Sequence, residues 1–507
     1  MTWNREDPYK PESKKIVWEV APYLRGRGLD IGAGDFKVLP HAISVDNMHH
    51  AMFGFQNKPD VLCAADKLDV FASQSMDFVY SSHTLEHVQD AAGALREWWR
   101  VVRVGGVLAL YLPHKEHYPL CGTEGANPDH KHDFCNEDII CMMEDMPAGW
   151  DLLENQVRTD NDEYSMLLVF KKLNGKARAF SYKRDKPEKT ACVVRYGAFG
   201  DLMQASSVFA GLKKQGFHVT VFTAAPGCQV IENDPNIDNM VVFDKDQVPN
   251  ANLVDFWRWQ KQKYDRWVNL SESAEGTLLA MPGRTLHFWP TKVRHLMMNY
   301  NYVELQHALA DVPHELNIKF FATAEEKHWA KKEREKIGGS KVILWSLAGS
   351  SVHKTWAGLD SILASLMIHF PDCRVVLTGG PECVLLEAGW EQESRIHRKS
   401  GVWTIRQTLS FMQVADLVIG PETGVMNAAA CEPMPKVVFL SHSSHENLTR
   451  DWVNTRPLAS AKTACYPCHK LHFSFEHCAK DEESGTAQCQ ADISVEQAWD
   501  TIAGALE

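Results

Sequence analysis

Short apolar runs recur along the chain, and in three places a glycine-rich turn follows one of them directly. The three turns contain Gly32, Gly197 and Gly349, and each would lead from a buried strand into a helix. Further apolar runs such as His218–Thr223 (HVTVFT) continue the strand pattern between these turns. We therefore expect an α/β protein with three parallel sheets of the nucleotide-binding type.

A polar stretch interrupts this pattern after the first sheet. Tyr164–Phe170 (YSMLLVF) is typical of a closing strand, and residues 171–190 are basic and contain few large apolar side chains. A second, weaker break falls in Glu333–Ser340 (EREKIGGS). These breaks predict a first domain at residues 1–172, a linker at 173–189, and two further domains at 190–325 and 340–507.

Length, composition and charge narrow the class of protein. The 507 residues suffice for roughly three domains, and 45% hydrophobic with 23% charged residues exclude wholesale disorder and a collagen-like chain. The formal net charge of -12 argues against nucleic acid as a partner. The chain shows neither an apolar run long enough to cross a bilayer nor the apolar core of a secretory signal at its start. Thirteen cysteines in so long a chain favour reduced thiols, so we expect a cytoplasmic protein.

The first glycine-rich turn opens an ordered series of polar residues that each follow an apolar run. Glycines at such a turn let the backbone approach a ligand closely, and acids at strand ends can accept hydrogen bonds from ribose hydroxyls or an adenine edge. In chain order the series is Asp30 with Gly32 and Gly34, then Asp46, then Asp66, and finally Ser82 with His83.

These segments resemble a class I S-adenosylmethionine-dependent methyltransferase domain of the type 11-like group, over about residues 14–172. The matching stretches are GLDIGAG, ISVD, AAD, SSHTLEHV and RVVRVGGVLALYLP. The resemblance implies a Rossmann-like domain with S-adenosylmethionine as its cofactor. It places Asp30, Gly32 and Gly34 on the methionine side, Asp46 on the ribose, Asp66 on the adenine and Ser82 beside the methyl group. His83 is our candidate general base, and Phe36 departs from the pattern because a third glycine usually stands there.

Two groups of metal-ligating residue types leave their role open. One is the loop set His114, His117, Asp129, His130, His132 and Asp133, whose spacing matches no metal motif, so loop histidines are favoured. The other is Cys465, Cys468, Cys478 and Cys489, where the first pair has zinc-ligand spacing and the second does not. Free thiols are the default for these cysteines, and we assign no metal ligand in the chain.

The second half of the chain carries three motifs suited to a diphosphate-linked sugar. RYGAFGD delivers Asp201 to the start of a helix, and LAGSSVHKTW combines Ser350 and Lys354 in a flexible loop. In ADLVIGPETGVMNAAA a strand ends at Glu422, and Thr423 with Gly424 opens a helix whose free amides would face an anion.

Together with VVLTGGPE, these motifs resemble the ADP-heptose:lipopolysaccharide heptosyltransferase family, over nearly all of residues 190–507. These are inverting glycosyltransferases of family 9, whose GT-B fold consists of two Rossmann-like domains. The resemblance implies that Asp201 is the general base and that Lys354 neutralises the leaving diphosphate without a metal. Ser350, Glu422, Thr423 and Gly424 would bind the nucleotide sugar. Two positions depart from the family, with Glu422 where aspartate is common and Asn427 where histidine is common.

Taken together, the sequence predicts a bifunctional glycan-modifying enzyme. It would transfer a sugar from an ADP-heptose-like donor to lipopolysaccharide or a related glycan, with peripheral contact with the inner membrane, and would also transfer a methyl group. One alternative is a glycosyltransferase whose methyltransferase-like domain is inactive and serves for docking. Another is an enzyme that modifies nucleic acid, which the negative charge disfavours. The sequence does not define the acceptor, linkage, donor base or oligomeric state.

Overall fold

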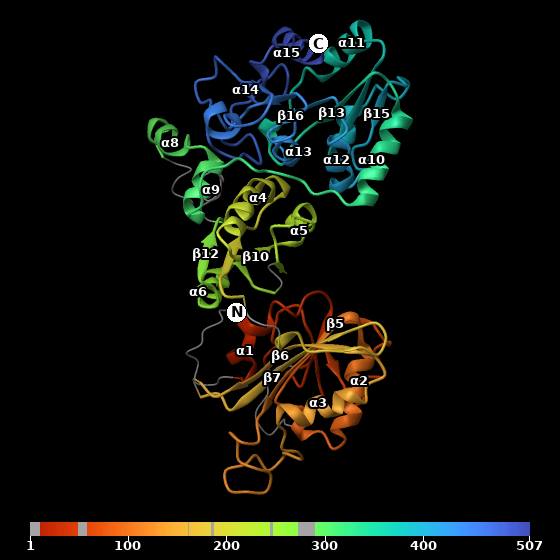
Figure 1. The fold of residues 1–507 in the computed structure, drawn as a ribbon, viewed down its shortest axis with the longest axis vertical. Coiled ribbons are helices and arrows are strands. Elements are labelled where there is room, and N and C mark those ends of the chain that lie inside the picture. The colour runs from red at the N-terminus through yellow and green to blue at the C-terminus, as the bar shows by residue number, and fades with distance from the viewer. Residues whose placement is uncertain (1–10, 49–57, 161, 184–186, 244–246, 272–288) are drawn as a thin grey trace. The chain divides into compact units, whose positions relative to one another are not determined.

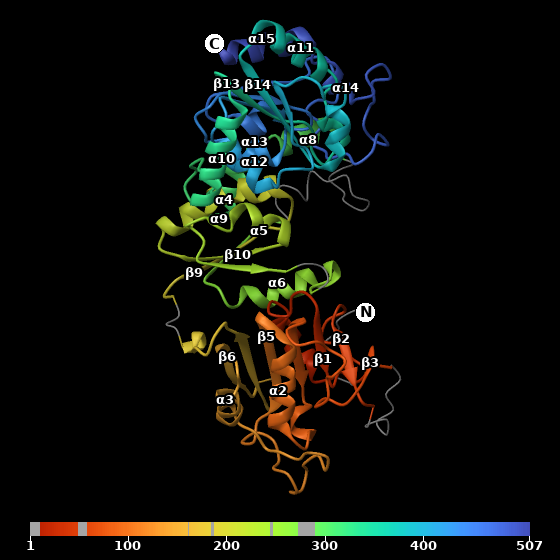
Figure 2. The same ribbon diagram turned by 90° about the vertical axis from the view of Figure 1, so that its right-hand side faces the viewer.

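The computed structural model describes residues 11–48, 58–160, 162–183, 187–243, 247–271 and 289–507. The chain forms two compact units (Figures 1 and 2). The first comprises residues 1–188 together with 243–263, and the second comprises residues 189–242 together with 264–507.

The first unit is built on an eight-stranded sheet with the order β3-β2-β1-β4-β5-β7-β6-β8. The five neighbouring strands β3, β2, β1, β4 and β5 run parallel, whereas β7 is antiparallel to both of its neighbours. The chain builds from β1 towards β3 and then continues on the other side of β1, so the direction of winding reverses between β1 and β4. The strands are β1 (Gly28–Ile31), β2 (Ile43–Asp46), β3 (Val61–Leu62), β4 (Met76–Ser82), β5 (Val102–Pro113), β6 (Trp150–Arg158), β7 (Ser165–Lys172) and β8 (Arg178–Ala179).

Helices α2 (Ala91–Val101) and α3 (Asn136–Glu144) pack on this sheet through one apolar cluster. Helix α2 begins after Asp90, whose carboxylate accepts a hydrogen bond from the amide of Gly93, 2.8 Å away. Its Trp98 and Trp99 are fully buried, which fixes the helix against the sheet. Two further helices, α1 (Ser13–Val20) and α6 (Leu253–Lys261), pack together through Trp18 and Phe256, with ring centroids 5.8 Å apart.

The second unit contains two wholly parallel sheets with helices around them (Figure 2). The four-stranded sheet has the order β11-β10-β9-β12, and the six-stranded sheet has the order β15-β14-β13-β16-β17-β18. Its strands are β9 (Thr190–Val194), β10 (His218–Thr223), β11 (Asn239–Val242), β12 (Arg266–Asn269), β13 (Lys341–Ser346), β14 (Cys373–Thr378), β15 (Ile396–Arg398), β16 (Leu417–Pro421), β17 (Lys436–Phe439) and β18 (Thr455–Leu458). Its helices are α4 (Phe199–Lys214), α5 (Ala225–Ile231), α8 (Thr291–Met298), α9 (Tyr302–Ala310), α10 (Ala324–Ile337), α11 (Leu359–His369), α12 (Ile405–Met412), α13 (Gly424–Ala429), α14 (Gln488–Ala491) and α15 (Val495–Leu506).

Two glycines let the helices that begin beside the two sheets of this unit approach each other closely. A Cβ atom on Gly424, the first residue of α13, would lie 2.9 Å from the Cβ of Phe199 at the start of α4. A Cβ atom on Gly200 would lie 2.7 Å from the side-chain nitrogen of Asn427. Asn427 in turn accepts a 3.2 Å hydrogen bond from the side chain of Gln204. Small residues are therefore required where the two halves of the unit meet.

The predicted fold class is confirmed, because each of the three glycine-rich turns follows a strand of a separate sheet. The antiparallel β7 is a departure from the expected all-parallel first sheet. The domain boundaries stay predictions. The proposed linker contains β8 and a short 3-10 turn (Ser181–Lys183). Residues 243–263 belong to the first compact unit. Among the described helices, none combines the length and apolar character needed to cross a membrane.

Candidate functional sites

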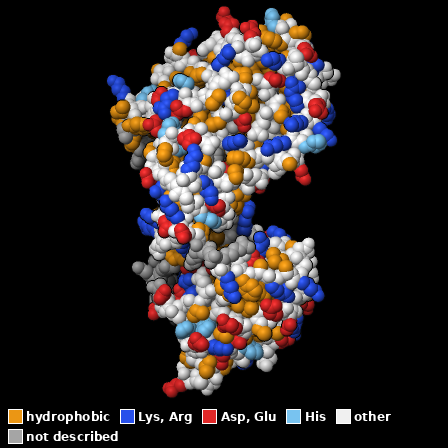
Figure 3. Space-filling view, in the orientation of Figure 1, with side chains coloured by type: hydrophobic (Ala, Val, Ile, Leu, Met, Phe, Trp, Pro, Cys, Tyr) orange, Lys and Arg blue, Asp and Glu red, His pale blue; other side chains and the backbone are white. Residues whose placement is uncertain are grey.

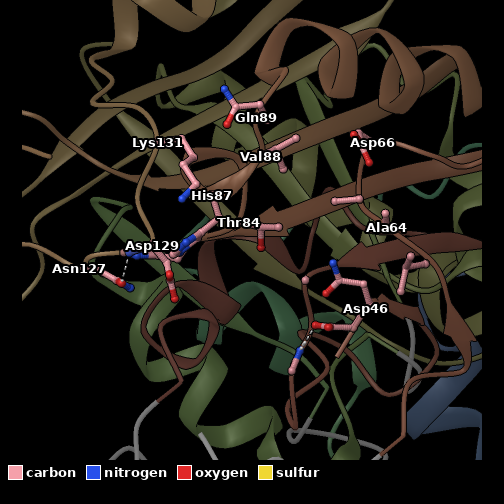
Figure 4. Close-up of a pocket in the computed structure, with 16 residues that line it drawn as sticks. Asp46, Ala64, Asp66, Thr84, His87, Val88, Gln89, Asn127, Asp129 and Lys131 are labelled. Atoms are coloured by element: carbon pink, nitrogen blue, oxygen red, sulfur yellow. Dashed lines mark hydrogen bonds between the residues drawn. The ribbon is translucent and has the colours of Figure 1, made fainter. Parts of the chain in front are cut away.

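A pocket of about 570 Å³ opens at the carboxyl ends of the first four strands of unit 1 (Figure 4). Gly32 follows β1, Asp46 ends β2, Asp66 follows β3 and Thr84 follows β4, and all four line the pocket. This edge includes the place where the winding of the sheet reverses, between β1 and β4. Parallel α/β sheets bind ligands at such a point, because the loops on either side diverge and leave a crevice.

The glycine turn after β1 has a backbone that only glycine adopts without strain. Gly32 has a φ of +73°, and a Cβ atom there would lie 1.9 Å from the hydroxyl oxygen of Thr84. The amide of Gly34 donates a 3.2 Å hydrogen bond to one carboxylate oxygen of Asp46, and the amide of Met48 donates a 2.7 Å hydrogen bond to the other. These bonds orient the Asp46 carboxylate at the pocket edge (Figure 4).

Five of the seven residues predicted for this site line the pocket. They are Gly32, Gly34, Asp46, Asp66 and His83. Asp30 and Ser82 are not among the described lining residues. The buried Asp30 carboxylate accepts a 2.6 Å hydrogen bond from the amide of Val38, and burial raises its pKa to about 7. In this structure Asp30 therefore holds the loop after β1, and its role toward the cofactor stays a prediction.

His83 is held in an unusual backbone conformation at the wall of the pocket. Its φ is +47°, which is uncommon for a residue with a side chain. Its Nε2 atom lies 2.9 Å from the hydroxyl of Ser165 on β7. Burial, together with the charge of Lys15, lowers the pKa of His83 to about 3, so its imidazole is neutral at physiological pH. A neutral imidazole with so low a pKa orients a partner better than it removes a proton.

Glu86 was not among the predicted site residues; it lies in the 3-10 turn η2 (Leu85–His87) beside the pocket. Its side chain is fully buried, and burial raises its pKa to about 8. The only available signal was the tripeptide LEH after a strand, and nothing in it indicates which distant residues surround the carboxylate.

A second pocket, of about 940 Å³, lies in unit 2 between loops from both of its sheets. The predicted base and the five residues predicted to bind the nucleotide sugar all line it. They are Asp201, Ser350, Lys354, Glu422, Thr423 and Gly424. The fold therefore brings residues from the start of α4 and from the loops after β13 and β16 to one cavity, although they are far apart in the sequence.

Asp201 occupies the first turn of α4 and remains partly accessible. One carboxylate oxygen accepts a 2.7 Å hydrogen bond from the amide of Ala198, which caps the helix, and the other lies 3.4 Å from the guanidinium of Arg195. The side chain is 26% exposed, so one face of the carboxylate can still reach a ligand. Asp201 is the third residue of α4, so its carboxylate can hold the amide of Ala198 before the helix and still face a ligand.

Lys354 and Glu422 are two charged residues that contact each other in the second pocket. Lys354 donates a 2.7 Å hydrogen bond from Nζ to the backbone carbonyl of Glu422. Burial would raise the pKa of Glu422, but the charges of His442 and Lys354 and hydrogen bonds from His442 and Ser441 lower it to about 2. The Glu422 carboxylate also accepts hydrogen bonds from Ser443. Glu422 therefore stays ionised and organises the loop after β17. The contacts of His442, Ser441 and Ser443 with this carboxylate were not predicted from the sequence.

The thirteen cysteines all lie within the described ranges, and no disulfide joins any two of them. Burial raises the pKa of Cys468 to about 12 and that of Cys478 to about 11, so these thiols are protonated at neutral pH. Within the described ranges, close groups of metal-ligating atoms occur at Glu86, His87 and His130 and at His114, Glu116 and His117. The four C-terminal cysteines do not form such a group.

The fold and first pocket define a methyltransferase-type domain, and comparison with known proteins agrees. Residues 29–110 match the model of the methyltransferase domain family. Demethylmenaquinone methyltransferase from Roseiflexus sp. is 37% identical over 114 residues, which is 20% of this chain and 48% of that protein. The enzyme of the same name from Roseiflexus castenholzii matches with the same identity and coverage. The chain spans about half the length of the curated relatives it matches.

Solved glycosyltransferase structures resemble part of the chain in fold. A family 9 glycosyl transferase from Veillonella parvula is 16% identical, with a TM-score of 0.46, and covers 63% of this chain and 97% of its own. The ADP-heptose LPS heptosyltransferase II of E. coli is 14% identical, with a TM-score of 0.46, and covers 62% and 98%. The iron-containing dodecameric glycosyltransferase TibC of enterotoxigenic E. coli is 14% identical, with a TM-score of 0.42, and covers 63% and 76%. Activity does not follow from likenesses at these identities and TM-scores.

Proposed function

We propose that the chain is a bifunctional transferase that modifies a glycan. Unit 1 would transfer a methyl group from S-adenosylmethionine, and unit 2 would transfer a sugar from a nucleotide sugar with inversion. The observation that carries the proposal is the convergence of six predicted residues, from two separate sheets, on the second pocket.

In unit 2 the chemistry requires a base on one side of the anomeric carbon and a cation on the other. Asp201 would take the proton of the acceptor hydroxyl while that oxygen bonds to the anomeric carbon. The bond from this carbon to the diphosphate breaks with its electron pair, and Lys354 stabilises the charge on the leaving group. Ser350 and Thr423 add hydroxyl donors at the same cavity. The tight contact of Gly424 with Phe199 keeps the two halves of the site together.

In unit 1 the residues present fit an S-adenosylmethionine molecule. The turn at Gly32 has no room for a side chain, and the Asp46 carboxylate is already oriented at the pocket where it can accept ribose hydroxyls. Asp66 would hold the adenine edge. The cofactor, when bound, supplies an electrophilic methyl group, and the enzyme mainly aligns the acceptor with it. We assign His83 to that alignment, because its pKa of about 3 makes it a poor base.

The donor and acceptor follow the resemblance of the second unit. We propose an ADP-sugar of the heptose type as donor and a lipopolysaccharide or related glycan as acceptor, reached by peripheral contact with the inner membrane. Lys354 serves the leaving diphosphate in this scheme. The face of the protein shown in Figure 3 carries basic side chains intermixed with acidic ones, which suits a glycan better than a continuous nucleic-acid backbone.

Thermal unfolding of the full chain with SAH, ADP, UDP or GDP tests both pockets, because a ligand that binds only the folded state raises its stability. We expect SAH and ADP each to stabilise the protein, and ADP more than UDP or GDP. Stabilisation by ADP with no response to SAH would leave unit 1 as an inactive docking domain. Tight, salt-dependent binding of DNA without a nucleotide response would instead favour nucleic acid as substrate.

A further inference from the structure

A buried carboxylate beside the methyl-donor pocket has three imidazoles arranged around one of its oxygens. The Oε1 atom of Glu86 lies 3.8 Å from Nε2 of His87, 3.8 Å from Nε2 of His130 and 3.9 Å from Nδ1 of His83. The Glu86 side chain is 0% exposed, and neither of its oxygens accepts a hydrogen bond from the residues that the structure describes. A carboxyl group buried in this way is costly unless something else binds it.

The backbone is built to bring the distant loop histidine to Glu86. The amides of Lys131 and His132 donate to the backbone carbonyl of Glu86, at 2.7 and 3.3 Å. The Nε2 atom of His132 lies 3.0 Å from the carbonyl of Val88, one turn further along. These contacts seat His130 over η2 with its side chain 5% exposed and its ring 4.7 Å from that of His87.

The distances between Oε1 of Glu86 and the three imidazole nitrogens are too long for hydrogen bonds. A direct hydrogen bond between an imidazole nitrogen and a carboxylate oxygen requires about 2.7–3.2 Å, and all three separations exceed that range.

The spacing is close to what a shared metal ion needs. Two ligands bound tetrahedrally at about 2.1 Å lie roughly 3.4 Å apart, so the nitrogens of His87 and His130 would each move about 0.4 Å closer to Oε1 of Glu86. We propose that Glu86, His87 and His130 bind a divalent transition-metal ion. Imidazole nitrogens with one carboxylate are a donor set that suits such ions. The hydroxyl of Ser165 at Nε2 of His83 holds that ring with Nδ1 toward the same carboxylate oxygen.

The location of this site indicates what the ion would do. His87, Thr84 and Asp129 line the methyl-donor pocket (Figure 4), as does His83, whereas the Glu86 side chain is fully buried. An ion held here would keep its open positions on the pocket side, where an acceptor oxygen can bind. This role rests on the proposed methyl transfer and narrows the acceptor class of unit 1 to compounds that carry a hydroxyl group. The ion would lower the pKa of that hydroxyl.

Titration of the chelator-treated full chain with Mn²⁺ tests the site, with calorimetry to give stoichiometry and affinity. Mn²⁺ is chosen because thiolates select softer metals, which keeps the C-terminal cysteines out of the measurement. We expect one Mn²⁺ per chain, and at least a tenfold loss of affinity in Glu86→Gln and in His130→Gln. The matched control is His117→Gln in the exposed group of His114, Glu116 and His117, which should bind Mn²⁺ like the unaltered protein.

Equal binding by Glu86→Gln and the unaltered protein would overturn the proposal, as would loss of binding in His117→Gln, which would mean an adventitious ion only. If Glu86→Gln does not fold, His87→Gln gives the same comparison at a partly exposed position. SAH-induced stabilisation, measured on the same samples, separates the two proposals. SAH binding without Mn²⁺ binding would refute the metal site alone, and Mn²⁺ binding without SAH binding would refute the methyltransferase function of unit 1.

Discussion

Replacing Gly32 by alanine tests whether the turn after β1 is shaped for a cofactor. Two costs combine at this position. A side chain at a φ of +73° strains the backbone by about 1 kcal/mol. The new Cβ atom would also lie 1.9 Å from the hydroxyl oxygen of Thr84, an overlap that costs about 1–3 kcal/mol to relieve. We expect Gly32→Ala to destabilise unit 1 by about 2–4 kcal/mol.

The structure offers a matched control for the backbone term alone. Gly122 has a φ of +78°, and a Cβ atom there would meet nothing within 4 Å. Gly122→Ala should therefore cost about 1 kcal/mol and leave SAH binding unchanged. In a domain of this size 1 kcal/mol corresponds to roughly 2–4 °C in Tm, so differential scanning calorimetry resolves the two variants.

The assay pairs calorimetry with SAH titration of the full chain. Gly32→Ala should lose more stability than Gly122→Ala and should bind SAH more weakly, because relief of the overlap with Thr84 moves the loop into the pocket. Equal Tm values for the two variants would refute the steric argument. Unchanged SAH affinity in a folded Gly32→Ala protein would refute the placement of the cofactor against this turn.

Three other substitutions test the remaining parts of the structure. Asp201→Asn should reduce glycosyl transfer by about 10²–10⁴-fold while leaving stabilisation by ADP unchanged, since only the base is lost; full activity would exclude that role. Gly424→Ala should lower the Tm of unit 2 by an amount equivalent to about 1–3 kcal/mol, because its Cβ would lie 2.9 Å from that of Phe199; no change would mean that the contact is loose. Burial raises the pKa of Asp30 to about 7 from 3.8, so the folded state retains a proton that the unfolded chain loses, and stability should fall as pH rises from about 4 to 7. Asp30→Asn should remove up to about 4 kcal/mol of that pH dependence in urea titrations, and an unaltered pH profile would show that Asp30 is ionised in the folded protein.

The sequence was sufficient to locate strands whose signal is local. The run at residues 218–223 becomes β10 over the same residues, and the three glycine turns follow β1, β9 and β13. The apolar pattern is strong there because parallel strands are buried on both faces. The same pattern does not encode direction, so the antiparallel insertion of β7 between β5 and β6 was not predicted.

The candidate sites show the same limit. Residues at strand ends, such as Asp46 and Glu422, could be found because their position in a motif implies where they face. Asp30 belongs to a recognised motif but accepts a hydrogen bond from Val38, a contact set by the loop's path. The grouping of Glu86 with His130 depends on a loop that folds back from a distant part of the chain, and no periodicity or spacing records such a return.

The path of the chain ties the two units together covalently in three places. It leaves unit 1 after residue 188, returns at residue 243, and leaves again after residue 263. The returning stretch contains α6, where Gln260 donates to the carbonyl of Trp18 and Phe256 packs on the ring of Trp18. A fragment that stopped at residue 188 would expose this tryptophan and lose that hydrogen bond. The methyltransferase part is therefore not one continuous segment of the chain. A gene rearrangement or a single protease cut between the units could not separate it intact. Its release would take three breaks in the chain rather than one.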